Sequence, residues 1–271
     1  MARPETDAPT AAGRTIVAIF AHPDDESLAC GGTLARLADA GARIVLLCAS
    51  RGEQGSISDP ALVPDGDLGR VRALELSEAA QVLGASDVLI FNHPDGDLRW
   101  AGVPELHAEI VSAIRTFQPD GVITFAEDGL YWHLDHIAVH ERTYTAIRSL
   151  GSEAPPLYYV TMAKGIMREV RETAVANGWA PPDSSFWGIE PDAFGDFATP
   201  PTFVVDVREW VPRKIAALRC HRTQMGPTNP FARIGAAEAR RWLGSEQFRR
   251  APIESAWDSI LEQLGEPVAS S

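Results

Sequence analysis

The sequence has few cysteines, and their spacing matches neither a disulfide framework nor a C-x-x-C motif. Cys30, Cys48 and Cys220 are odd in number and lie far apart along the chain. A small secreted fold held by disulfides would show an even, closely spaced set. We therefore expect reduced thiols, and we predict a cytoplasmic location.

Long apolar runs are also lacking. The first one, TIVAIFA at 15–21, is far shorter than the roughly 20 residues that a helix needs to cross a bilayer. The N-terminal segment before it is polar, carries both charge signs and has no apolar core of a signal peptide. We expect residues 1–13 to form a disordered tail and residues 14–271 to form a single domain.

Positive charge is the third feature in short supply. Lys and Arg together number 24 against 37 Asp and Glu, so the formal net charge is −13. A chain with this balance repels nucleic acids and anionic membrane surfaces, and no local basic patch offsets it. We expect neither a nucleic-acid nor a membrane partner, whereas a homo-oligomer stays open.

Continuous apolar runs alternate with helical periodicity through the first half of the chain. Buried parallel strands have this continuous apolar pattern. The pattern predicts an α/β fold, a Rossmann-like and mostly parallel sheet with helices on both faces. The predicted strands are 15–21, 42–50, 87–92 and 120–126. The predicted helices are 27–41, 68–84, 103–118 and 134–150.

The second half of the chain is less regular. We predict strands at 157–163 and 202–207, and a helix at 207–224 that is entered through a proline. The segment 178–201 is rich in proline, glycine and aromatic residues. It is too apolar for a linker, so we expect an ordered loop excursion from the domain.

A polar cluster follows each of the first four predicted strands. The clusters are HPDDE at 22–26, SRGE at 50–53, NHPDGD at 92–97 and EDGLYWHLDH at 127–136. The carboxyl ends of parallel strands lie along one edge of a sheet, and ligands bind in the crevice there. We therefore expect the active site at this edge.

Two of these clusters together contain the donors of a metal site. His22 and Asp25 follow the first strand and His136 follows the fourth, and two imidazoles with one carboxylate suit a catalytic Zn²⁺. Asp24 and His133 remain beside them as a free base and a free imidazole, as metal-assisted hydrolysis requires. The alternative is structural, since acidic residues at a helix start often serve as caps.

The motifs themselves resemble those of a known family. AHPDDESLACGGTLARLADAGARIVLLCASRGE at 21–53 and GLYWHLDH at 129–136 are similar to motifs of the PIG-L/LmbE family of metal-dependent N-acetylglucosamine deacetylases. PDGDL after the third strand and HRTQ at 221–224 also fit. The resemblance runs from about residue 15 to about residue 230. Family members often have HPDH where this chain has HLDH.

The resemblance implies a set of metal ligands and a base. His22, Asp25 and His136 match the zinc ligands of the family, and Asp24 matches its general base. One Zn²⁺ per chain is therefore expected, and Fe²⁺ is an alternative that some members use.

The resemblance also implies roles for five further residues around the metal. His133 matches the imidazole that acts as general acid and electrostatic stabiliser, and Asp135 matches the carboxylate that orients it. Tyr131 matches a tyrosine that stabilises the oxyanion. Arg51 and Asp95 match positions that hold sugar hydroxyls.

The implied function is removal of an N-acetyl group from a small N-acetylglucosamine-containing molecule, which yields acetate and a free amine. A second enzyme hypothesis within the family is an amidase of thiol conjugates or other N-acyl amines. A two-metal phosphoester hydrolase is a third hypothesis, but the carboxylates are few for two metals. A sugar- or nucleotide-binding module is disfavoured because no GxGxxG follows the first strand.

Overall fold

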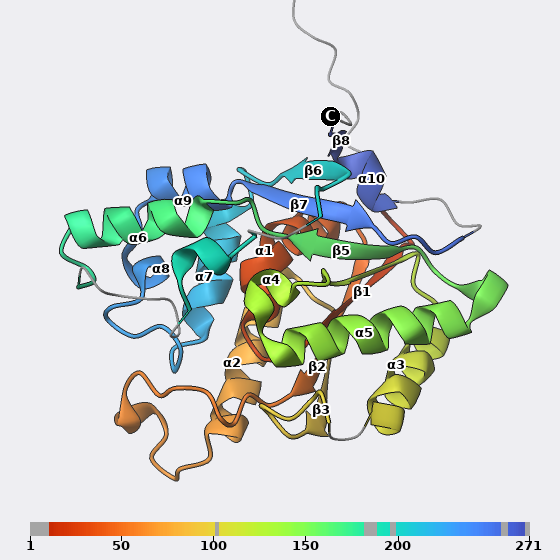
Figure 1. Cartoon of the computed structure of the whole chain (residues 1–271), viewed down its shortest axis with the longest axis horizontal. Helices are drawn as coiled ribbons and strands as arrows, with labels where there is room; N and C mark the ends of the chain where they lie inside the picture. The colour runs from red at the N-terminus through yellow and green to blue at the C-terminus, as the bar shows by residue number, and fades with distance from the viewer. Residues whose placement is uncertain (1–10, 101–102, 182–188, 196–198, 256–259, 269–271) are drawn as a thin grey trace, which may run out of the picture.

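The computed structural model describes residues 11–100, 103–181, 189–195, 199–255 and 260–268 (Figure 1). Most of the predicted N-terminal tail, residues 1–10, lies outside this part of the chain. Ala11 is buried, and its N–H donates to the carbonyl of Ala40 at 2.8 Å. The packed part of the chain therefore includes Ala11, which lies within the predicted tail, and the domain bounds 14–271 stay a prediction.

The centre of the molecule is one eight-stranded sheet with the order β3-β2-β1-β4-β5-β7-β6-β8. Neighbouring strands from β3 to β5 are parallel, whereas β7 runs antiparallel to β5 and to β6, and β8 antiparallel to β6. The predicted mostly parallel α/β sheet is therefore confirmed. The strands are β1 Thr15–Phe20, β2 Arg43–Ser50, β3 Asp87–His93, β4 Gly121–Phe125, β5 Leu157–Thr161, β6 Phe203–Asp206, β7 Ser245–Arg250 and β8 Glu266–Pro267.

Helices cover both faces of the sheet (Figure 1). On one face α1 (Asp25–Asp39), α2 (Leu68–Leu83) and α7 (Val211–Cys220) pack on one another. On the other face α3 (Val103–Phe117) packs on α5 (Leu134–Ser149). The chain runs outward from β1 to β3 and then returns to β4, so the strand order reverses between β1 and β4. A crevice forms at such a reversal, beyond the carboxyl ends of the strands.

The elements that the sequence pattern missed lie mostly in the second half. They are β7, β8 and the short helices α4 Gly129–Trp132, α6 Ile166–Ala176, α8 Pro230–Arg233, α9 Ala236–Leu243 and α10 Ile260–Leu264, with single 3₁₀ turns at Pro60–Leu62, Gly151–Glu153 and Pro191–Ala193. Strand β7 reads SEQFRR and has no apolar alternation. It is a strand because it fits between β5 and β6, where Phe248 is fully buried.

Two predictions about segments of the second half need correction or restriction. The helix predicted over 207–224 is shorter, since α7 ends at Cys220 and the next residues turn away to make buried polar contacts. In the excursion 178–201, residues 182–188 and 196–198 lie outside the described chain. Phe194 is buried there, with its ring centroid 4.7 Å from that of Tyr131.

The structure also bears on the expectations about membrane spans and cysteines. No helix within the described ranges combines the length and the apolar character needed to cross a membrane. Cys30, Cys48 and Cys220 are all free thiols.

Helix α1 is broken, and a distant carboxylate stabilises its second half. Cys30 has φ −143° and ψ 21°, which interrupts the helix. The N–H groups of Gly32 and Thr33 donate to Glu246 on β7, at 2.9 and 2.7 Å. Glu246 also binds Lys214 of α7 at 2.6 Å, and each of these two side chains is 2% exposed. This carboxylate therefore joins α1, α7 and the sheet at one buried point.

We expect Glu246→Gln to lower the free energy of unfolding by about 3–5 kcal/mol, because it leaves the Lys214 ammonium buried without a counter-charge. Denaturant unfolding measures the change. The matched control is Glu169→Gln, which removes an exposed pair with Arg241 and should cost at most about 1 kcal/mol. A loss at Glu246 no larger than in the control would show that the buried pair does not support the fold.

Candidate active site

The loops after the strands converge on one cavity of about 430 Å³. Charged side chains come from the motifs and from α2, and apolar side chains come from α1, α4, α7, α8 and neighbouring loops. The polar wall includes His22, Asp24, Asp25, Arg72, Asp95 and His133. The apolar wall includes Leu28, Tyr131, Ile189, Leu218, Met225 and Phe231. The cavity therefore lies at the edge of the sheet where the sequence places the active site.

The three predicted metal ligands meet at one point of this wall. Nδ1 of His22 and Nε2 of His136 are 3.2 Å apart. Asp25 Oδ1 lies 3.2 Å from His136 Nε2, and Asp25 Oδ2 lies 3.6 Å from His22 Nδ1. All three side chains are buried. Residues from two separate strand ends thus present nitrogen and oxygen atoms to a common centre.

Hydrogen bonds on the far side of each ring set its tautomer. His136 Nδ1 is 3.0 Å from the carbonyl oxygen of Gly129, to which it can only donate. His22 Nε2 is 3.0 Å from Asp95 and 3.2 Å from Asp135, so it carries a proton toward these carboxylates. The two remaining ring nitrogens face each other and Asp25, and a metal ion bound there would take their lone pairs in place of protons. Such lone pairs repel unless a cation lies among them, so this donor set fits a divalent metal.

A third imidazole lies next to this set but is less suited to bind metal. Ring nitrogens of His22, His133 and His136 lie within 4.8 Å of one another. The Nδ1 atom of His133, however, accepts the N–H of Asp135 at 3.2 Å. Its Nε2 then carries the proton of the neutral ring, so neither nitrogen has a lone pair to give.

The charge of His133 follows from its surroundings. Burial, together with the neighbouring His136 and His22, lowers the pKa of His133 to about 4. The resting ring is therefore neutral near pH 7 and not an imidazolium. The Asp135 carboxylate binds His22 and the N–H groups of Gly96 and Leu98, and the contact of Asp135 with His133 is made by its backbone N–H. Its role in orienting His133 stays a prediction.

Asp24 occupies the N-cap position of α1 without acting as a cap. Its carboxylate makes no capping hydrogen bond, and its backbone has φ 119° and ψ −25°. Non-glycine residues rarely adopt this conformation, and it marks functional sites more often than structural ones. Burial, opposed by Arg72 and aided by Asp25, raises the pKa of Asp24 to about 6. The capping alternative for Asp24 is therefore wrong.

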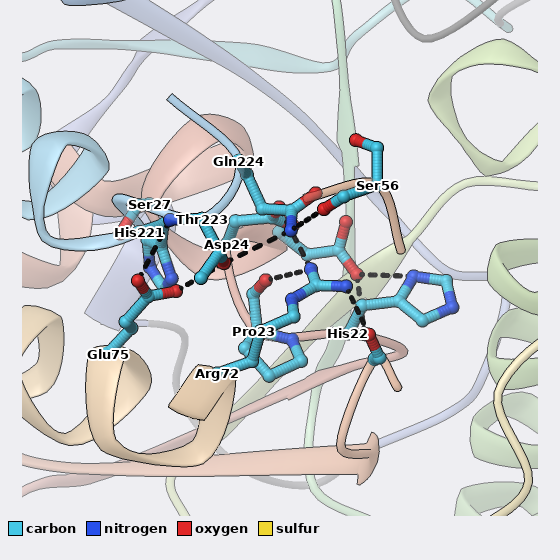
Figure 2. Close-up of polar contacts among 12 residues, drawn as sticks. His22, Pro23, Asp24, Ser27, Ser56, Arg72, Glu75, His221, Thr223 and Gln224 are labelled. Atoms are coloured by element: carbon cyan, nitrogen blue, oxygen red, sulfur yellow. Dashed lines mark hydrogen bonds and ion pairs between the residues drawn. The ribbon is translucent and has the colours of Figure 1, made fainter. Parts of the chain in front are cut away.

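Sequence reasoning missed a charged residue of the site. Arg72 is 4% exposed, lines the cavity and donates to Pro23 O at 2.6 Å and to Asp24 Oδ2 at 3.1 Å (Figure 2). Arg51, predicted to hold sugar hydroxyls, is exposed and does not line the cavity. A signal was present, because Arg72 falls on the buried stripe of α2 between Leu68 and Leu76.

Asp95 and Tyr131 both reach the cavity. Asp95 lines it, but its two oxygens already bind His22 and the N–H of Gln54. Asp95 thus orients His22, a proposed metal ligand, and its contact with sugar hydroxyls stays a prediction. Tyr131 lies with its ring centroid 5.1 Å from that of His136. Burial raises the pKa of Tyr131 well above its usual value, so the phenol is a neutral donor.

Comparison with known proteins gives the family of the chain. Residues 17–147 match the model of the family described as "PIG-L: GlcNAc-PI de-N-acetylase". The 1D-myo-inositol 2-acetamido-2-deoxy-alpha-D-glucopyranoside deacetylase of Thermobispora bispora is 30% identical over 270 residues, which covers 88% of each chain.

Solved structures share the fold. The N,N'-diacetylchitobiose deacetylase of Pyrococcus horikoshii is 25% identical with a TM-score of 0.58, covering 88% of this chain and 84% of that one. The 4-carboxy-2-hydroxymuconate hydratase of Pseudomonas putida is 19% identical with a TM-score of 0.62, covering 91% and 99%, so the fold alone does not decide the reaction. The motifs in sequence, their convergence in space and the 30% identical relative together show that the chain belongs to the PIG-L family of de-N-acetylases.

Proposed function

We propose that this protein is a metal-dependent N-deacetylase of small N-acetylglucosamine-containing molecules, from which it releases acetate and leaves a free amine. One observation carries the proposal. The Asp24 carboxylate caps no helix N–H and lies beside the donor atoms of His22, Asp25 and His136, which converge on one centre. A base next to a metal-binding set is the arrangement that hydrolysis of an unactivated amide needs.

The metal of the proposal is one Zn²⁺ per chain, held by His22, Asp25 and His136. When bound, such an ion lowers the pKa of water to about 7 and polarises a carbonyl group. Fe²⁺ would accept the same imidazole and carboxylate donors. The Asp95 and Asp135 carboxylates orient His22 for this purpose.

In the proposed reaction, Asp24 carries the proton, and His133 and Tyr131 stabilise the oxyanion. Asp24 accepts the proton of the attacking water, and Arg72 holds its carboxylate toward the cavity. His133 presents its Nε2–H as a neutral donor to the developing oxyanion, and the Tyr131 hydroxyl is a second neutral donor nearby. The proton gained by Asp24 then passes to the departing amine.

The proposed substrate class follows from the cavity and from the relatives. The names of the relatives describe acetamido-glucopyranoside and diacetylchitobiose substrates. We propose the same N-acetylglucosaminide class for this chain, since a cavity of about 430 Å³ has a volume usual for small-molecule sites. Charged Asp95 and Arg72 on its wall offer partners to sugar hydroxyls.

A substrate panel tests the proposal. With Zn²⁺ present we expect acetate and amine from N-acetylglucosamine, its 1D-myo-inositol glycoside or N,N'-diacetylchitobiose. Hydrolysis of N-acylated thiol conjugates alone would instead identify the amidase alternative. Release of phosphate from phosphoesters, together with two metals per chain by elemental analysis, would identify the phosphoesterase. Loss of turnover after chelation and its return with Zn²⁺ or Fe²⁺ identifies the ion.

The remaining expectations are part of the same proposal. Three free thiols agree with a reducing compartment, so we propose a cytoplasmic location. We propose that residues 14–271 form one domain, to which the packed residues from Ala11 onward also belong. Size-exclusion chromatography with light scattering would establish whether the chain is a homo-oligomer.

A further inference from the structure

Two buried side chains outside the proposed reaction, Glu26 and His221, support the proposed base on the side away from the cavity. The N–H of Asp24 donates to Glu26 Oε2 at 3.0 Å. Glu26 is 2% exposed, and its Oε1 lies 2.9 Å from Nε2 of His221 and accepts the Ser27 hydroxyl. His221 is fully buried and directly follows α7. Two buried side chains thus connect the end of α7 to the backbone of Asp24.

This connection acts at a strained residue. The backbone conformation of Asp24 is unfavourable for a non-glycine residue, so surrounding contacts must maintain it. An aspartate at an N-cap otherwise turns its carboxylate to the N–H groups of the first helical turn. Here the Asp24 carboxylate points to Arg72, while Glu26 takes the N–H of Asp24. The contact with Glu26 therefore stabilises the conformation in which the base faces the cavity.

His221 is in turn fixed by the residues that follow it. Thr223 donates its N–H and its hydroxyl to the two oxygens of Glu75 on α2, at 2.9 and 2.7 Å. Gln224 donates to the carbonyl oxygen of Ser56 at 2.8 Å. Glu75 lies three residues after Arg72 on the same helix, so α2 supports Asp24 both directly and through His221.

The ring of His221 makes no other polar contact that explains its burial. Within the described ranges, its Nδ1 atom has no hydrogen-bond partner. A buried polar atom without a partner is unfavourable, so the cost of placing imidazole here is offset through Nε2 and Glu26. Without His221, the Glu26 carboxylate would lose its partner at Oε1 and could turn to other donors.

We propose that His221 is a positioning residue for the reaction: it fixes Glu26, and Glu26 fixes the backbone of Asp24 so that the Asp24 carboxylate faces the cavity. The inference rests on the proposed function, in which Asp24 is the base. It assigns the HRTQ segment at 221–224 to the support of that base rather than to contact with the metal.

The first test compares three variants by steady-state acetate release, metal content and thermal unfolding. We expect His221→Ala to lower kcat by about 10–10²-fold, the scale of a small misplacement of a catalytic group, with little change in KM and one metal per chain. His221→Gln keeps an N–H donor for Glu26 and should recover most of kcat. His140→Ala removes a buried histidine that binds Phe125 O, and it should affect the midpoint of unfolding more than kcat.

The second test separates positioning from general stability. In an Asp24→Asn background, His221→Ala should not lower the residual kcat further, because the group it positions no longer acts. Losses that multiply in the double variant, or full kcat in His221→Ala, would overturn the proposal. Should His221→Ala fail to fold, Glu26→Gln replaces it in the same cycle with the same expected result. An inactive wild-type enzyme on every N-acetylglucosaminide would overturn the proposed function instead, before any variant is needed.

Discussion

Asp24→Asn is expected to lower kcat by about 10²–10⁴-fold, the usual contribution of a general base, while the metal stays bound. Asparagine keeps the size of the side chain and can still contact Arg72 through its amide oxygen, so the fold and the cavity should persist. Acetate release under saturating substrate and elemental analysis of the same preparation measure the two effects. Near-normal turnover with bound metal would show that Asp24 is not the base.

The pH dependence of the wild-type rate tests whether the Asp24 carboxylate must be deprotonated for turnover. A base acts only when deprotonated, so turnover should fall as pH falls through the pKa of Asp24, which burial raises to about 6. A bound cation lowers that pKa, so the midpoint of the acid limb should lie at or below about pH 6. The limb should be missing from the residual activity of Asp24→Asn.

His22→Ala and His136→Ala are expected to lose both metal and turnover. Replacing a residue that only orients a ligand costs about 10–100-fold in metal affinity, so removing a ligand should cost at least as much. Competition with a chelator of known affinity measures the change, and circular dichroism reports whether the chain is folded.

A graded series makes this test specific. Asp95→Asn, which removes no ligand but weakens the contact that orients His22, should show the smaller loss of metal affinity, about 10–100-fold. His140→Ala removes an imidazole one helical turn beyond His136 and should retain the metal. Full metal content in both ligand variants would contradict the assignment of His22 and His136.

The sequence pattern predicted the parts of the site that lie next to each other along the chain. His22, Asp24 and Asp25 follow a buried strand directly, and the rule that strand ends share an edge brings His136 to them. The sequence pattern did not place the partners of these groups. Asp135 is adjacent to His136 in sequence, yet its carboxylate binds His22, because the start of α5 turns that side chain inward.

Side chains from helix faces were harder to predict than those from strand ends. The resemblance places Arg51, which follows a strand, in the site, but Arg51 is exposed and does not line the cavity. Arg72 instead reaches the site from the buried stripe of α2. Strand β7 was missed for a similar reason, since it depends on contacts that are distant in sequence. Its polar sequence becomes a strand only through pairing with β5 and β6, contacts that no local pattern contains.

The carboxylate of Glu246 sets an order of events during synthesis. It accepts the N–H groups of Gly32 and Thr33 from 214 and 213 residues away. At a translation rate of about 5–20 residues per second, the second half of α1 waits roughly 10–40 s for this partner. The nascent chain therefore completes the helix that begins at the proposed metal ligands only after β7 has left the ribosome.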